Sequence, residues 1–397
     1  MSTLNETPAA NRIHIGFFGK RNSGKSSLVN AFSGQSVSIV SNVAGTTTDP
    51  VYKAMEINGL GAAVLIDTAG FDDIGPLGEI RVEKTKKAAD RTDIAVILFT
   101  GPDITRELHW FRYFKERGTT AIPVISKTDA VEPGEPFIRR VEDAVSARPL
   151  LASAVSGEGI EELRARIIES LPDTDTNRSI LGNMVSEGDL VLLVMPQDIQ
   201  APTGRLILPQ VQTIRELLDK KCLVMCAASD TFIEAIDKLK APPDLIITDS
   251  QVFDVVFKNK PEISRLTSFS ILFAGYKGDL PYYLEGVNQV EKLTESSRVL
   301  IAECCTHAPL GEDIGRVKIP RMLRGKAGDG ITIDVCGGAD FPDSLSDYDL
   351  IIQCGGCMFN RKHIMNRIGK AMAQGVPMTN YGVFLAHMSG ILDKIAY

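Results

Sequence analysis

Residues 19–26 carry the pattern G-x-x-x-x-G-K-S, a residue set that proteins use to hold the phosphates of a nucleotide. An apolar run at residues 13–18 precedes it and predicts a buried strand, and residues 27–32 predict the start of a helix. In this setting the glycines let backbone N–H groups surround phosphate oxygens. Lys25 supplies a positive charge to the outer phosphates, and Ser26 offers a hydroxyl to Mg²⁺. The pattern therefore predicts a nucleoside-triphosphate site.

A second short pattern, D-x-x-G, begins at Asp67 and ends at Gly70, directly after an apolar run at residues 62–66. Asp67 can hold Mg²⁺ through a water molecule, and the backbone N–H of Gly70 can contact the γ-phosphate. The polar segment between the two patterns contains Thr47, our candidate for a further Mg²⁺ ligand. An ordinary turn would also explain D-x-x-G, so its weight comes from its place at a strand end about 40 residues after Lys25.

A third pattern, S-K-T-D, follows another apolar run and is close to the N-K-x-D that selects guanine. Asp129 can accept hydrogen bonds from N1–H and N2–H₂ of guanine, which adenine does not offer, and the stem of Lys127 can pack on the base. Ser126 replaces the usual asparagine, which weakens the pattern without removing it. Ser153 and Ala154 fit the short last loop, where a backbone N–H meets O6 of the base. Loops in this order at successive strand ends predict a GTPase.

The cysteines predict a separate site, because all seven lie after residue 220. Cys305 and His307 follow one predicted strand, and Cys354 and Cys357 form a C-x-x-C pair after another. Since the carboxyl ends of parallel strands meet at one edge of a sheet, these side chains can converge on one metal centre. Cys304 points the other way along the backbone and is expected to be buried. The spacing alone leaves three interpretations open: a structural Cys₃His zinc site, a redox pair, or a [4Fe–4S] cluster held by three thiolates.

Parallel strands are needed to position these loops, and the chain repeats an apolar run, a polar turn and a helical stretch. We predict an α/β fold, with a P-loop GTPase domain followed by two further α/β domains with mainly parallel sheets. The predicted domains are 1–173 for GTP binding, 174–265, and 266–397. In the second half the predicted strands fall at residues 190–195, 222–227, 245–248, 270–274, 299–302, 331–335 and 350–352.

Composition narrows the functional classes. The net charge of −7 and a pI near 5.4 argue against a broad nucleic-acid surface. No run of 18 apolar residues exists, so no membrane span is expected. Residues 1–12 are polar and lack an apolar signal core, which predicts a short leader on a cytoplasmic protein. An odd number of cysteines in such a chain favours metal or redox chemistry over a disulfide framework.

Asn22 in the phosphate loop and the segment G-T-T-x-D at residues 45–49 resemble the Era/TrmE-like branch of translation-factor-type GTPases. The resemblance implies that Asn22 helps to bind a K⁺ ion near the place where an arginine finger would act. Phe71 stands where Ras-like enzymes carry a water-orienting glutamine, so slow hydrolysis is expected. The predicted catalytic residues are Lys25, Asn22, Thr47 and Gly70. The predicted nucleotide contacts are Gly19, Asn22, Ser23, Gly24, Lys25, Ser26, Ser27, Asp67, Gly70, Lys127, Asp129, Ser153 and Ala154.

The whole chain resembles the HydF family of [FeFe]-hydrogenase maturation GTPases, which combine such a GTPase domain, a middle α/β part and a terminal C-x-H…C-x-x-C domain. This resemblance favours the [4Fe–4S] interpretation, with Cys305, Cys354 and Cys357 as ligands. It implies that residues 174–265 mediate dimerisation. The family pattern has a second histidine where this chain has Gln353, so ligation by a histidine there is in doubt. The candidates for the fourth ligand are His307 and Asp198.

By the same resemblance, the chain receives a two-iron precursor from radical-SAM maturases and delivers it to [FeFe]-hydrogenase, as a homodimer or larger homo-oligomer. The expected cofactors are GTP, Mg²⁺, K⁺ and the [4Fe–4S] cluster, and neither nucleic acid nor a membrane is an expected partner. The alternative is an RNA- or ribosome-associated GTPase of the Era/TrmE branch with a structural zinc site. RNA binding that falls steeply with salt would favour that alternative.

Overall fold

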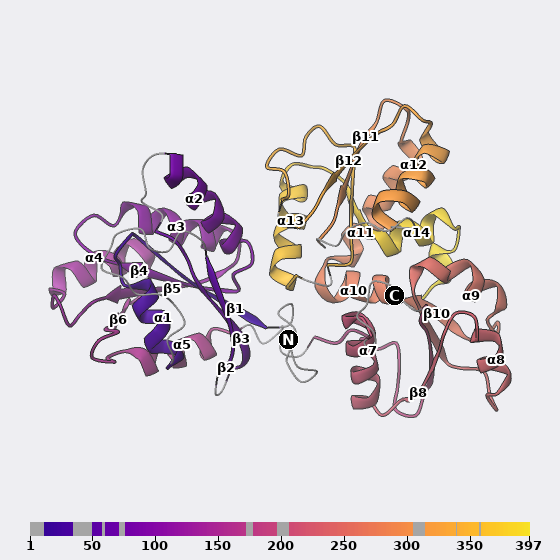
Figure 1. The fold of residues 1–397 in the computed structure, drawn as a ribbon, viewed down its shortest axis with the longest axis horizontal. Helices are drawn as coiled ribbons and strands as arrows, with labels where there is room; N and C mark the ends of the chain where they lie inside the picture. The colour runs from indigo at the N-terminus through magenta and orange to yellow at the C-terminus, as the bar shows by residue number, and fades with distance from the viewer. Residues whose placement is uncertain are drawn as a thin grey trace. The chain divides into compact units, whose positions relative to one another are not determined.

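The computed structural model describes residues 12–34, 50–57, 60–70, 76–171, 178–196, 206–304, 314–338, 340–356 and 359–397, with only the backbone of residues 76–79. The chain forms two compact units, Met1–Thr176 and Asn177–Tyr397 (Figure 1). Nearly all of the predicted leader lies outside the described residues. Within the described ranges, no helix combines the length and the apolar character needed to cross a bilayer.

The first unit is built on one sheet with the strand order β2-β3-β1-β4-β5-β6, in which only β2 runs antiparallel. Its strands are β1 (Ile13–Gly19), β2 (Val51–Ile57), β3 (Gly61–Asp67), β4 (Ile94–Phe99), β5 (Thr120–Ser126) and β6 (Leu150–Ala152). Its helices are α1 (Lys25–Ser33), α2 (Pro76–Ala89), α3 (Thr105–Glu116), α4 (Glu135–Val145) and α5 (Ile160–Glu169). The carboxyl ends of the parallel strands share one edge, where the predicted nucleotide loops after β1, β3, β5 and β6 begin.

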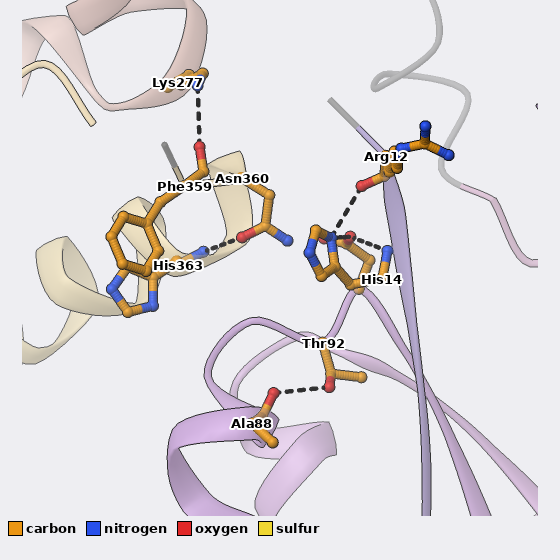
Figure 2. A network of polar contacts seen from close by, with 9 residues as sticks. Arg12, His14, Ala88, Thr92, Lys277, Phe359, Asn360 and His363 are labelled. Atoms are coloured by element: carbon orange, nitrogen blue, oxygen red, sulfur yellow. Dashed lines mark hydrogen bonds and ion pairs between the residues drawn. The ribbon is translucent and has the colours of Figure 1, made fainter. Parts of the chain in front are cut away.

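Successive side chains of these buried strands enter two different cores, as the pleat requires. Phe17 faces one core, which α1 and α5 cover, and Phe18 faces the other, which α3 and α4 cover. Near the opposite end of the sheet, Thr92 Oγ1 donates to Ala88 O at 3.0 Å and His14 Nδ1 lies 2.9 Å from Arg12 O (Figure 2).

The second unit holds two fully parallel four-stranded sheets. The first has the order β10-β9-β7-β8 and the second the order β12-β11-β13-β14. The strands are β7 (Leu190–Val194), β8 (Leu223–Ala227), β9 (Leu245–Thr248), β10 (Arg265–Ser268), β11 (Arg298–Ala302), β12 (Thr332–Cys336), β13 (Leu350–Gln353) and β14 (Met378–Asn380). The α-helices are α7 (Leu208–Asp219), α8 (Phe232–Asp237), α9 (Phe253–Asn259), α10 (Phe269–Lys277), α11 (Leu280–Gly286), α12 (Ile319–Ala327), α13 (Arg361–Ala373) and α14 (Tyr381–Met388). Shorter helical turns are η2 (Ser250–Val252), η3 (Val287–Lys292), η4 (Ile314–Lys318) and η5 (Leu392–Lys394).

Helix α10 joins the cores of the two sheets. Phe269, Leu272 and Phe273 lie in a core with β7 and β9, whereas Ile271 and Ala274 lie in a larger core that also contains β11 and β13. The two sheets therefore share packing within one unit.

The predicted α/β class with mainly parallel sheets is confirmed, but one predicted strand is wrong. Residues 270–274 belong to α10, because Ser268 caps this helix by accepting a hydrogen bond from Ile271 N. An apolar run of this length does not distinguish a buried strand from a buried helix. The predicted division between residues 265 and 266 falls within β10, which pairs with β9. The first sheet of the second unit therefore crosses the predicted division at 265/266.

Candidate nucleotide and metal sites

The phosphate loop leaves β1 at Gly19 and enters α1 at Lys25. Gly24 has φ 90°, a conformation that favours glycine, and the exposed Asn22 has φ 59°, in the left-handed region that asparagine tolerates. Lys25 is 7% exposed, and its Nζ donates to Gly19 O at 3.0 Å and to Lys20 O at 2.7 Å. This ammonium is therefore held against the loop, where phosphate oxygens can replace the carbonyls. Ser23 is buried, and Ser26 and Ser27 are half-buried in the first turn of α1.

A second lysine, which the sequence patterns do not single out, anchors this loop. Lys20 Nζ lies 3.1 Å from Glu107 Oε2 of α3 and also donates to Asp103 O. Glu107 is fully buried, and burial raises the pKa of its carboxyl. A signal for this carboxylate was present, because Glu107 shares the apolar face of α3 with Trp110 and Phe114, three and seven residues later.

The D-x-x-G segment contacts β1, the strand that leads into the phosphate loop. Asp67 ends β3 with 1% exposure, and Thr68 Oγ1 donates to Phe17 O of β1 at 2.7 Å. Gly70 is buried as the last described residue of this segment. Thr47 lies outside the described residues. The described part of this segment therefore places the Asp67 carboxylate at the same edge of the sheet as the phosphate loop that leads to Lys25.

The base-selecting segment is tied to the phosphate loop through the residue that departs from the usual pattern. Ser126 Oγ donates to Ser23 O at 2.7 Å, so this serine links the end of β5 to the phosphate loop. Lys127 has φ 65°, and a Cβ added to Gly24 would lie 3.6 Å from Lys127 Cε. The stem of Lys127 thus lies beside the phosphate loop, where a base can stack on it.

Asp129 is oriented by the last predicted loop. Ser153 is fully buried, and its Oγ donates to Asp129 Oδ1 at 2.6 Å while it accepts from Val155 N and Ser156 N, each at 3.1 Å. These two backbone donors commit the hydroxyl hydrogen of Ser153 to the carboxylate. Ala154 follows β6 and is half-buried. The exposed Asp129 therefore keeps one oxygen for Ser153 and has the other free to meet a base.

In the second unit, the two cysteine-bearing strands are neighbours. β11 pairs with β13, with Ala302 opposite Gln353, so both end at the same edge. Cys304 N donates to Cys354 Sγ at 3.0 Å. As expected, Cys304 is buried. Its pKa is raised, mainly by the hydrogen bond with Cys354 and to a lesser extent by burial. Cys305, His307, Cys357 and Asp198 lie outside the described residues.

Hydrogen bonds from α10 hold the loop after Cys354. Lys277, 2% exposed, donates through Nζ to Gly356 O at 3.1 Å and to Phe359 O at 2.9 Å (Figure 2). Gly356 has φ 64°, and a Cβ there would lie 2.6 Å from Ile364 Cδ1. His363 N donates to Asn360 Oδ1, and the His363 ring stacks on Phe359 with centroids 4.2 Å apart. The loop conformation is therefore fixed at its described ends.

The described donors at this edge suit thiolate ligation. A sulfur that accepts a backbone N–H is stabilised in its anionic form, and such contacts are typical around iron–sulfur ligands. Cys304 and Gly356, the described neighbours of Cys305 and Cys357, both lie here. Within the described ranges, however, no three His, Cys, Asp or Glu side chains gather closely enough to hold a metal ion.

Comparison with protein families matches three consecutive parts of the chain. Residues 14–127 match the family described as 50S ribosome-binding GTPase. Residues 180–278 match the hydrogen maturase F dimerization domain, and residues 281–396 match the hydrogen maturase F tetramerization domain.

The curated relatives align with part of the chain. The tRNA modification GTPase MnmE of Chromobacterium violaceum is 32% identical over 172 residues, 40% of this chain and 35% of that protein. The GTPase Der of Wolinella succinogenes is 44% identical over 93 residues, 23% of this chain and 20% of that protein. The chain thus spans about a third or less of the length of these relatives.

Among solved structures, Era in complex with MgGDPNP and a 16S ribosomal RNA fragment aligns with a TM-score of 0.37 at 20% identity, over 54% of this chain and 91% of that chain. A probable GTP-binding protein, engB, aligns with a TM-score of 0.33 at 22% identity, over 39% of this chain and 97% of that chain.

Proposed function

The chain belongs to the hydrogen maturase F family, and we propose that it is a GTP-hydrolysing scaffold that carries a [4Fe–4S] cluster. In this proposal it assembles or delivers the two-iron precursor of the [FeFe]-hydrogenase active site, which is its cargo. The observation that carries the proposal is the pairing of β11 with β13, which ends in the contact between Cys304 N and Cys354 Sγ.

For the GTPase half, Lys25 binds the outer phosphates, and Ser26 and Thr47 hold Mg²⁺ with Asp67 behind it. Gly70 senses the γ-phosphate. Asp129 and Lys127 select guanine, supported by the hydrogen bond from Ser153. These roles are supported by the shared strand edge and by the GTPase family match over residues 14–127.

Hydrolysis is proposed to be slow and to be activated by K⁺ through Asn22. The left-handed backbone and the exposure of Asn22 leave its amide oxygen accessible to a cation at the phosphate loop. GTP binding then biases contacts with hydrogenase and radical-SAM maturases, and the metal chemistry remains in the second unit.

For the cluster half, Cys305, Cys354 and Cys357 are the proposed ligands, with His307 or Asp198 as candidates for the fourth position. Such a cluster supplies an exchangeable iron site for docking a second iron fragment. The chain's own contribution is to hold Cys354 through Cys304 N and to fix the following loop through Lys277.

Anaerobic reconstitution of the full chain, with iron, sulfide and zinc analysis and EPR of the reduced protein, tests this proposal. We expect about four irons and four sulfides per chain. Cys354→Ala removes a thiolate ligand and is expected to lose the reduced-cluster EPR signal. Cys226→Ala, at an exposed thiol of β8, is the matched control and keeps it. One tightly bound zinc without a cluster would contradict the scaffold and favour the RNA- or ribosome-associated GTPase.

The family match over 180–278 is a dimerization domain, and we propose that one face of α7 with the adjoining edge strand β8 contacts a second copy of the chain. Val211 and Leu218, two helical turns apart, are 47% and 56% exposed, and Leu223 of β8 is 62% exposed. β8 packs beside α7 and is an edge strand of its sheet in the described part of the chain, so these exposed apolar side chains belong to adjoining elements at the sheet edge.

The double variant Val211→Asp with Leu218→Asp places two charges in that interface. We expect self-association to weaken at least about 100-fold, because buried apolar anchors contribute roughly 2 kcal/mol or more each. Size-exclusion chromatography with light scattering reports the mass of the particle. Val255→Asp, at a 49% exposed site of α9, is the control and should leave the mass unchanged. An unchanged mass in the double variant would exclude this surface.

A further inference from the structure

Arg367 of α13 is a buried cation beside the proposed cluster edge. The residue is only 3% exposed. Its Nη1 donates to Gln353 Oε1 at 3.1 Å and approaches Cys304 Sγ and Glu303 O, each at 3.4 Å. Its Nη2 donates to Gly338 O at 2.5 Å.

None of these partners carries a full negative charge when the thiol is protonated. Among the described residues no carboxylate forms an ion pair with Arg367, and its buried Nε has no acceptor there. The carboxylate of Glu303, whose backbone oxygen contacts Arg367, pairs instead with the partly exposed Arg316 at 3.0 Å. Removing a charge from water without a counter-charge is strongly unfavourable, even when neutral acceptors surround it. Among the described residues, the guanidinium therefore has neutral hydrogen-bond partners, and an anion beside it would compensate its charge.

Thiolate ligands of a cluster at this edge can provide such an anion. Cys304 Sγ contacts the guanidinium directly, and Cys354 Sγ is held by Cys304 N at 3.0 Å. Three thiolates on a [4Fe–4S] core give a net negative charge that grows by one unit on reduction. A fixed cation in a low-dielectric interior stabilises the more negative state.

Gln353, which departs from the family pattern, connects the cation to both sulfurs. It is fully buried and accepts from Arg367 through Oε1. Its Nε2 donates to Cys304 Sγ at 3.0 Å and to Cys354 O at 3.2 Å, and lies 3.9 Å from Cys354 Sγ. An amide has both a donor and an acceptor end, so it can satisfy the guanidinium and the sulfur at once.

We propose that Arg367 is the buried counter-charge of the iron–sulfur cluster, that Gln353 positions it against Cys304 and Cys354, and that the pair raises the reduction potential of the cluster. This inference rests on the proposed cluster function. Two residues that are not cluster ligands thereby stabilise the reduced state of the cluster electrostatically.

The test is an EPR-monitored redox titration of the reconstituted full chain. Arg367→Met removes the charge at similar length, and we expect at least a tenfold lower ratio of reduced to oxidised cluster at a fixed potential, which is 59 mV for one electron. Arg316→Met is the matched control: it removes a cation at the same strand end that is 42% exposed and screened by water, and should leave the potential within a small fraction of that shift. Equal potentials in Arg367→Met and the wild type would overturn the inference.

A second variant guards against a failure of Arg367→Met to fold. Gln353→Glu is nearly isosteric and gives the cation a carboxylate. We expect it to lower the potential in the same direction, and to raise the urea midpoint of the cluster-free chain because the buried charge is then paired. A lower midpoint in the cluster-free chain would contradict a missing counter-charge. Absence of iron from the wild-type chain would instead overturn the proposed function, and it is seen in the metal analysis before any variant is compared.

Discussion

The Lys25→Ala variant is expected to lose GTP turnover by at least about 100-fold in kcat while it keeps its iron. The ammonium of Lys25 is nearly buried and is held at the phosphate loop by two carbonyls, so it is preorganised to meet the charge that develops on the transferred phosphoryl group. Removing one preorganised electrostatic contact of this kind costs about 10²–10³-fold in rate.

Phosphate release measured under saturating GTP and Mg²⁺ checks this expectation. Lys53→Ala, at an exposed lysine of β2, is the matched control for loss of a positive charge from the same unit and should stay within about twofold of the wild type. Iron and sulfide content of the Lys25→Ala chain should equal that of the wild type, because the cysteines lie in the other compact unit. Loss of both turnover and iron would contradict the separation of the two functions.

The placement of the described nucleotide loops at one edge of the sheet was predictable from sequence, because each of these loops has a local signal. Glycine at 24, lysine at 25 and the carboxylates at Asp67 and Asp129 stand at the ends of apolar runs that leave little choice but a buried strand. The role of Ser126 was not predictable, since its bond to Ser23 O joins residues 103 positions apart. The short side chain of Ser126 reaches the phosphate loop only because the backbone of Ser23 lies close to it in the folded chain. This proximity depends on the tertiary structure and cannot be inferred from the local sequence.

The second unit was less predictable for two physical reasons. Residues 271–274 are all apolar, because α10 packs between two cores, so this run has no periodicity that would have indicated a helix. Strand β14 has only three residues and was not predicted. Arg367 lies on a helix rich in lysine and arginine, where a basic side chain is usually solvated. Only the contacts of Arg367 with the ends of β11 and β13 distinguish it from the half-buried basic residues of the same helix.

The Asp129→Asn variant is expected to exchange the preference for GTP for a preference for xanthosine triphosphate. The carboxylate of Asp129 accepts hydrogen bonds from the N–H groups of guanine. In the variant the amide NH₂ faces these N–H groups, and two donors cannot form a hydrogen bond with each other. A site built to bond particular polar groups rejects a mismatched base by about 10⁴-fold, because buried polar atoms are left unpaired.

Ser153 decides which end of the amide meets the base. Its hydroxyl already accepts from Val155 N and Ser156 N, so it must donate to residue 129 and will hold the amide oxygen of the variant. The amide NH₂ then faces the base, where xanthine carries a carbonyl oxygen in place of the guanine amino group. The kcat/KM values for both nucleotides check the exchange, with Asp143→Asn, at an exposed carboxylate of α4, as control. If the Asp129→Asn chain kept its preference for GTP, base selection would have to come from the backbone of the loops at Lys127 and Ala154 instead.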